Sequence, residues 1–254
     1  MRKFVLAGLS VTIALAVAAV AYAQYSQPIL TVTTSAVTPA KGGTKKKPKN
    51  GNINTVFTVN KESRVTLRRI EYKIPPKLKL DGTGFKTCSE AAIGQGGGDA
   101  CPKGSQVGTG GATALLGPQQ TPLTFTAQVF VASKNTLVFA LSNSLVGTVP
   151  ITATITPGTG GQTVGFDIPA RVQSPVSGLY SYVTSVTANL GKQAGISGKT
   201  TTGKGKKKKK RFFATLRGCS GGKHTTNVTT FYANNPNPPS VAQQTSSGTS
   251  TCKK

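Results

Sequence analysis

The chain's hydrophobic residues alternate with polar ones along much of its length. Between residues 124 and 131 every second side chain is apolar, and the alternation resumes at residues 137–141 after a turn at Ser133-Lys134-Asn135. A two-residue period places successive side chains on opposite faces of an extended strand. These two runs therefore predict a β-hairpin with one buried face.

The same pattern recurs through the rest of the chain, and helical periodicity is almost absent after the N-terminal segment. Further strands are expected in the runs 29–37, 54–59, 65–74, 107–116, 151–155, 164–168, 182–190, 212–216 and 228–232. The apolar phase changes near Arg68-Arg69, which indicates a β-bulge in that strand. About ten strands separated by turn residues predict an all-β fold of sandwich-like antiparallel sheets.

Residues 1–23 have the three zones of a secretory signal peptide. Arg2 and Lys3 precede an apolar run that ends in the small-residue sequence Ala21-Tyr22-Ala23. Cleavage is predicted after Ala23, which makes the protein secreted or associated with the cell envelope. An uncleaved membrane anchor is the alternative, because the apolar run is just long enough to span a bilayer. Residues 24–254 are expected to form a single β-rich domain.

Three segments interrupt the strand pattern of this domain. Residues 41–50 and 191–211 combine lysine runs with glycine or proline and lack apolar periodicity, so both are predicted to be flexible loops. Residues 234–254 form a tail of low complexity that Cys252 would tether near its end.

Positive charge dominates the composition. The chain has 31 Lys and Arg residues against six Asp and Glu residues, for a formal net charge of +25. Self-repulsion of this size favours counterions or an acidic partner. Clustered ammonium groups on exposed segments bind polyanions by releasing condensed counterions, so anionic cell-wall or extracellular polymers are the expected partners. The candidate polyanion-binding residues are Lys45, Lys46, Lys47, Lys49, Lys206, Lys207, Lys208, Lys209, Lys210 and Arg211.

A plainer interpretation gives these lysines no role beyond solubility or retention in the wall. No aromatic residues are interleaved with the lysines, so base stacking on single strands is not expected and no specific nucleic acid is predicted. Peripheral contact with an anionic membrane surface is a further expectation. The sequence leaves the oligomeric state open.

Four cysteines in an exported chain indicate two disulfides. Cys88 and Cys101 bracket a glycine-rich loop, and Cys219 and Cys252 bracket the C-terminal segment, so sequential pairing is the simplest of the three connectivities. A zinc site is disfavoured, because the sole histidine, His224, follows Cys219 at no familiar ligand spacing. Neither a metal nor another cofactor is predicted.

Candidates for catalysis are few. The chain offers one histidine and six carboxylates, and it contains no nucleophile-elbow motif. Glu71 and Asp167, each in an expected strand, are the best pair for a secreted hydrolase. We expect them instead to face solvent or to pair with arginines such as Arg69 and Arg171, so the protein is predicted not to be an enzyme.

Two further alternatives remain at this stage. A β-sandwich that carries an apolar or carbohydrate ligand would enclose a cavity among Phe125, Phe139, Phe166 and Tyr182. A structural coat component without a small ligand would look the same in sequence.

One motif has a counterpart elsewhere. Cys88-Ser89-Glu90 with the run Ala100-Cys101-Pro102-Lys103-Gly104 and its continuation to Gly110 resembles a motif of uncharacterised exported, β-rich, lysine-loop proteins of high-GC Gram-positive bacteria. The order of signal, two lysine runs and a terminal Cys252-Lys253-Lys254 is also similar. This resemblance implies secretion and a β-rich fold, and it brings no catalytic residue.

Overall fold

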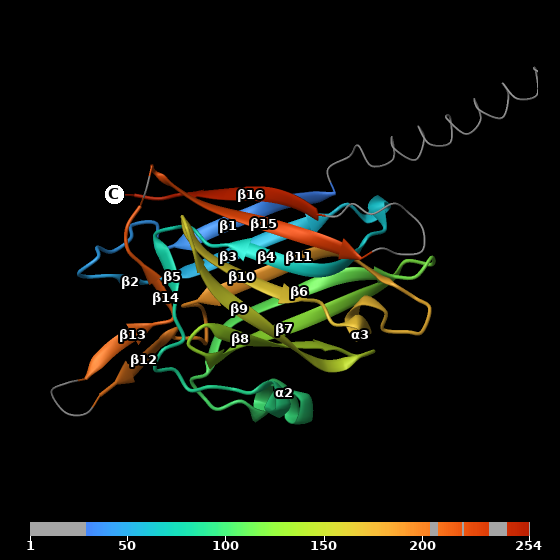
Figure 1. Ribbon diagram of the computed structural model, residues 1–254, viewed down its shortest axis with the longest axis horizontal. Helices are drawn as coiled ribbons and strands as arrows, with labels where there is room; N and C mark the ends of the chain where they lie inside the picture. The colour runs from blue at the N-terminus through green and yellow to red at the C-terminus, as the bar shows by residue number, and fades with distance from the viewer. Residues whose placement is uncertain (1–28, 204–207, 220, 234–242, 254) are drawn as a thin grey trace, which may run out of the picture.

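The computed structural model describes residues 29–203, 208–219, 221–233 and 243–253 (Figure 1). The expected signal peptide, Lys206 and Lys207 lie outside the described residues. Within them the protein is all-β, as the alternation predicts.

Eleven antiparallel strands form one continuous sheet. In spatial order they are β1 (Leu30–Thr38), β3 (Asn52–Val59), β11 (Ser181–Gly191), β6 (Gln106–Leu116), β7 (Thr121–Ser133), β8 (Thr136–Asn143), β9 (Gly147–Gly158), β10 (Gly161–Asp167), β4 (Thr66–Lys73), β15 (Lys223–Ala233) and β16 (Gln243–Thr251). The sheet rolls on itself, so that its two edge strands, β1 and β16, lie side by side (Figure 1).

Side chains of β16 bridge the two edges. Gln244 Oε1 accepts hydrogen bonds from the backbone N–H groups of Ile29 and Leu30, each at 3.0 Å. Ser246 and Ser250 accept bonds in the same way from Val32 and Val37, each at 3.1 Å. Edge donors that would otherwise be open to another strand are therefore satisfied within the molecule.

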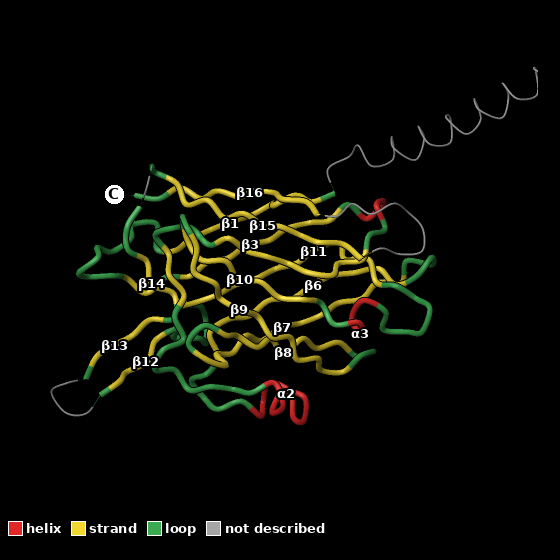
Figure 2. Tube along the Cα trace, viewed as in Figure 1, coloured by secondary structure: helices red, strands yellow, loops and turns green. Residues whose placement is uncertain are grey.

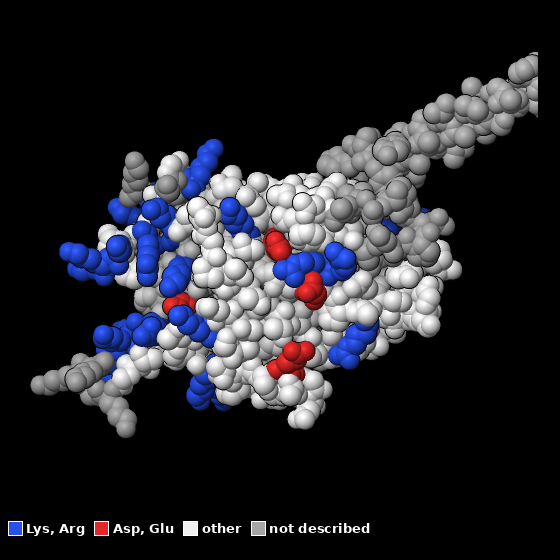
Figure 3. All heavy atoms as spheres, in the orientation of Figure 1, with Lys and Arg blue, Asp and Glu red and all other residues white. Residues whose placement is uncertain are grey.

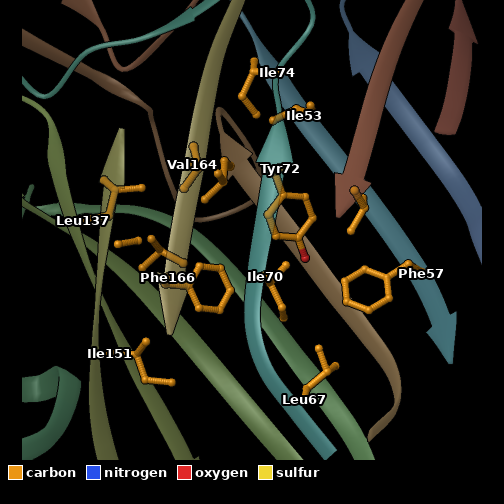
Figure 4. Close-up of a cluster of buried hydrophobic side chains, with 14 of the residues drawn as sticks. Ile53, Phe57, Leu67, Ile70, Tyr72, Ile74, Leu137, Ile151, Val164 and Phe166 are labelled. Atoms are coloured by element: carbon orange, nitrogen blue, oxygen red, sulfur yellow. The ribbon is translucent and has the colours of Figure 1, made fainter. Parts of the chain in front are cut away.

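Strand alternation places the inward residues in one hydrophobic core. Figure 4 shows part of it, with Phe57, Ile70, Tyr72 and Phe166 converging from β3, β4 and β10. The predicted hairpin is the β7–β8 pair, in which Val129 opposes Phe139. The predicted bulge is present as well, because Arg69 pairs with Phe231 and Leu67 with Tyr232, leaving Arg68 as the extra residue.

Smaller elements cover one end and the side of the rolled sheet (Figure 2). They are the three-stranded sheet of β2 (Lys49–Asn50), β14 (Ala214–Leu216) and β5 (Leu78–Leu80), the hairpin of β12 (Lys199–Thr202) and β13 (Lys209–Phe212), and the helices η1 (Lys61–Ser63), α2 (Glu90–Gly96), η2 (Gly97–Ala100) and α3 (Ala170–Gln173). The disulfides pair sequentially, Cys88 with Cys101 and Cys219 with Cys252. None of the described helices is long and apolar enough to cross a membrane.

All three of the expected irregular segments contain strands. The segment 41–50 ends in β2, part of 191–211 forms the β12–β13 hairpin, and the tail expected over 234–254 contains β16, a full edge strand. These differences have one physical cause: the strands have little apolar alternation and are held by pairing and by contacts far away in sequence.

Candidate functional site

The two lysine-rich segments meet at one end of the molecule. Strand β2, which ends the first segment, pairs with β14, which directly follows the second segment: Lys49 opposes Leu216, and Asn50 opposes Thr215. The other edge of β14 pairs with β5, which adds Lys79 opposite Thr215. We call this region the basic end, and Figure 3 shows its Lys and Arg side chains gathered over these elements.

The first segment is folded back on the small sheet. Gly43 donates its backbone N–H to the carbonyl of Leu216 at 3.3 Å. A turn follows, in which the N–H of Thr44 bonds to the carbonyl of Lys47 at 3.0 Å and the N–H of Lys47 bonds to Thr44 Oγ1 at 2.9 Å. The backbone of this segment is thus hydrogen-bonded, while Lys45, Lys46 and Lys47 remain exposed.

Part of the second segment forms the β12–β13 hairpin, and a buried aromatic side chain lies at the base of this hairpin. Thr202 opposes Lys209 and Thr200 opposes Arg211, so threonines face the basic residues across the two strands. At the base of the hairpin, Phe213 is fully buried and meets the ring of Phe85 edge-on, with 6.1 Å between centroids. This anchor fixes the point from which the hairpin projects.

Basic residues isolated in the sequence join the two segments at this end. The backbone N–H of Arg217 bonds to the carbonyl of Lys77, and a bridge joins Lys41 to Lys253. The exposed basic residues that these pairings bring to the basic end are Lys41, Lys45, Lys46, Lys47, Lys49, Lys77, Lys79, Lys199, Lys208, Lys209, Lys210, Arg211, Arg217 and Lys253. Sequence analysis missed those outside the two runs, because only strand pairing brings them together.

Few carboxylates oppose this charge. Among the described residues, one ion pair involves the basic end, between Lys79 and Asp81 at 3.6 Å. Burial alone would raise the pKa of Asp81, but hydrogen bonds from Thr83 and the nearby Lys79 outweigh burial and lower it. Asp81 therefore stays ionised at neutral pH and offsets a single lysine.

A cleft adjoins the basic end. It has a volume of about 470 Å³ and lies between the disulfide-closed loop and residues 195–199. Lys103 and Lys199 line it together with one carboxylate, Asp99. The surface beside the basic end is therefore partly concave, and an extended polymer could lie partly within the cleft.

The candidate hydrolytic residues are arranged differently from a catalytic pair. Arg69 bonds to Glu71 at 2.9 Å and to Asp167 at 3.2 Å, beside a hollow of about 340 Å³. The hydrogen bond with Glu71, above all, raises the pKa of Arg69. The guanidinium thus occupies the space between the carboxylates, where a water or a scissile bond would have to sit. Arg171 instead donates to the carbonyl of Thr148.

His224 lies away from these carboxylates. It is five positions before Thr229, the residue opposite Glu71, which corresponds to roughly 16 Å along β15. His224 is 2% exposed, and its Nε2 has no hydrogen-bond partner among the described residues. Burial lowers its pKa. In the described part of the chain, no group of three or more His, Cys, Asp and Glu residues could hold a metal ion.

The interior contains an apolar cavity of about 70 Å³. Phe125, Phe139 and Phe166 line it, as expected for a ligand-carrying sandwich, whereas Tyr182 is not among its lining residues. The alternation along β11 explains this difference, since Ser181 and Val183 line the cavity and Tyr182 points the other way.

Comparisons with known proteins add no information about the basic end. No family model matches the chain, and no curated protein and no solved structure is detectably similar to it.

Proposed function

We propose that this protein is a non-enzymatic, exported protein that adheres to anionic cell-wall or extracellular polymers through its basic end. The observation that carries the proposal is the convergence of residues 41–49 and 208–211 at β14, which pairs with β2 at the end of the first run and follows β13 of the second run in sequence. Two runs far apart in sequence thereby form one positive surface. Export is part of the proposal, and the two disulfides are compatible with an extracellular location.

The charge on this surface is available to a partner. The described lysine side chains of both runs are exposed, and no described carboxylate pairs with any of them. Neighbouring ammonium groups within about 8 Å, the screening length at physiological salt, repel one another. A polyanion relieves that repulsion and gains entropy by releasing its condensed counterions.

The same surface supports contact with anionic membranes as a secondary mode. Each lysine close to an anionic bilayer contributes about 1 kcal/mol. No aromatic side chain stands between the lysines of either run, so a polymer would be held by its charges rather than by stacking. The proposal therefore names a class of partner, the polyanions outside the cell, and no specific nucleic acid.

Elution from heparin resin tests the proposal with matched variants. One variant carries Lys45→Gln, Lys46→Gln and Lys47→Gln, and a second carries Lys208→Gln, Lys209→Gln and Lys210→Gln. Each should elute at clearly lower salt than the mature wild type, because each loses three of the charges that face the polymer.

The control removes the same number of positive charges near the start of β4, whereas the basic end lies beyond the end of this strand. It carries Lys61→Gln, Arg64→Gln and Arg68→Gln. All three residues are exposed, and they lie in η1, directly after η1 and in β4, respectively. This variant should elute close to the wild type. Equal shifts for all three variants would mean that only net charge matters, and the basic end would lose its role.

A further inference from the structure

The cleft beside the basic end has two walls that the fold holds in place. The first, residues 98–104, is closed by the disulfide between Cys88 and Cys101. The second, residues 195–199, is fixed to the small sheet, because the carbonyl of Ser197 accepts a hydrogen bond from Asn50 Nδ2 at 2.8 Å. The volume of about 470 Å³ lies within the range of about 300–1,000 Å³ that is typical of ligand sites. The cleft is therefore a pre-formed space of the size that small ligands occupy.

Two glutamines on neighbouring strands line the cleft between these walls, Gln106 on β6 and Gln128 on β7. Gln128 is exposed, and its side-chain amide has no hydrogen-bond partner among the described residues. A Cβ at Gly98 would collide with Gln128 Oε1, so the glycine leaves room for this amide. Gln106 Nε2 donates to the carbonyl of Gly108 at 3.3 Å, and its Oε1 remains as an acceptor. The cleft thus offers amide donors and acceptors together.

The charged residues of the cleft have mixed signs. Lys103 extends from the first wall and Lys199 from the second, and both are exposed. Asp99 is exposed as well, and in the described part of the chain it forms no ion pair with either lysine. The apolar side chains of the lining are Phe85, Phe130 and Ile196. A ligand that matches this lining has an anionic group, several hydroxyls and some apolar surface.

A bare polyphosphate matches the lysines but not the rest of the lining. Asp99 would repel an anionic group close to it, and the amide oxygen of Gln128 would face a ligand that has no proton to donate. The hydroxyls of a sugar ring both donate and accept, so they can bond to Asp99 and to either end of the Gln128 amide. The mixed lining therefore favours an acidic sugar.

We propose that the cleft binds one anionic sugar unit of the polymer, a hexose-sized ring that carries a single carboxylate or phosphate group. Lys103 and Lys199 hold the anionic group, while Gln128 and Asp99 bind ring hydroxyls. This inference deepens the proposed function, on which it rests for the class of polymer. The lysine runs supply adhesion through charge, and the cleft adds a preference for acidic polysaccharides over bare polyphosphates.

Four small probes separate the two requirements in NMR titrations of the mature protein at constant ionic strength. Glucuronate and glucose 6-phosphate have hydroxyls and an anionic group, glucose has hydroxyls alone, and inorganic phosphate has charge alone. Both anionic sugars should shift the side-chain amide of Gln128 and the backbone amides of Gly98 and Gly104, which line the cleft. Each should bind at least about tenfold more tightly than glucose or inorganic phosphate, and the tighter of the two identifies the anionic group.

A glutamine variant and a matched control test the role of the amide. Gln128→Met keeps the length of the side chain and should weaken both anionic sugars about fivefold, the equivalent of one hydrogen bond, while leaving inorganic phosphate unchanged. Gln119 is also exposed but lies in the turn before the other end of β7, so Gln119→Met should change nothing. If Gln128→Met disturbs the cleft, Lys103→Gln provides a second test, because it should weaken glucuronate and leave glucose unchanged.

Two results would overturn the assignment of the cleft. They are anionic sugars that bind no more tightly than glucose, and a glucuronate affinity that neither Gln128→Met nor Lys103→Gln changes. Heparin elution of the lysine-run variants tests the proposed function separately. Elution unaffected by those substitutions, together with glucuronate bound in the cleft, would remove charge-based adhesion and leave the cleft as a sugar site.

Discussion

Replacing Tyr72 with phenylalanine is expected to stabilise the protein. Loss of a tyrosine hydroxyl usually destabilises a fold, since most buried hydroxyls are paired. Here the hydroxyl is buried without a partner among the described residues, while its ring packs 6.2 Å from Phe57 and 6.4 Å from Phe166, centroid to centroid. The substitution keeps the ring contacts and removes an unsatisfied polar atom.

The expected gain follows from the desolvation of one hydroxyl. An unpaired buried polar group destabilises a protein by about 1–3 kcal/mol, so the unfolding free energy should rise by about 1–2 kcal/mol. In a domain of this size, that corresponds to an increase of about 2–4 °C in Tm for each kcal/mol. Urea denaturation at pH 7 with the disulfides intact should show a higher midpoint at unchanged slope.

Tyr232 provides the matched control. It is 5% exposed, but its hydroxyl accepts a hydrogen bond from Thr230 Oγ1 at 2.7 Å. Tyr232→Phe breaks this bond and should destabilise the protein by about 1 kcal/mol. The opposite signs of the two tyrosine variants constitute the prediction. If Tyr72→Phe destabilises as Tyr232→Phe does, the Tyr72 hydroxyl has a partner and the reasoning fails.

Three further predictions concern other parts of the fold. Burial lowers the pKa of His224, so below about pH 6.5 the unfolded chain binds more protons at this residue than the folded protein does. The unfolding free energy should therefore fall as the pH drops below about 6.5. His224→Gln should make denaturation curves between about pH 7 and 5 less dependent on pH. Replacing both Cys219 and Cys252 with serine should lower the unfolding free energy by about 3–4 kcal/mol for a loop of this length, and thermal denaturation that is unchanged would contradict this. Gln244→Ala leaves the N–H groups of Ile29 and Leu30 without their partner, so hydrogen exchange at Leu30 should accelerate, whereas equal protection in both proteins would show that the edge is held otherwise.

Local alternation was enough to predict the β7–β8 hairpin and the bulge at Arg68. In both cases the apolar phase along a few residues decides which side chains face the core. Sequential disulfide pairing was also predicted, since each pair brackets one short segment.

The closure of the sheet could not be predicted in the same way. Strand β16 is rich in Gln, Thr and Ser and has only Gly248 buried, so its sequence shows no inward face. It is a strand because it pairs along β15 and because its side chains reach the edge of β1. Such long-range pairing overrides local propensity.

The two candidate sites differ in how much the sequence revealed. The lysine runs are visible as runs, but their convergence depends on the pairing of β2 with β14. The cavity depends on register, because Gly110 and Ala127 become neighbours only when β6 and β7 are aligned. The burial of the Tyr72 hydroxyl without a hydrogen-bond partner among the described residues follows from three-dimensional packing and has no signature in the sequence.

The salt dependence of binding to poly(glycerol phosphate) tests the account of the basic end most directly. If about five lysines engage the polymer, the logarithm of the affinity should fall linearly with the logarithm of salt, with a slope of about −4, or about 15-fold for each doubling of salt. The variant with Lys45, Lys46 and Lys47 replaced should show a shallower slope. An affinity that persists undiminished in concentrated salt would contradict the account.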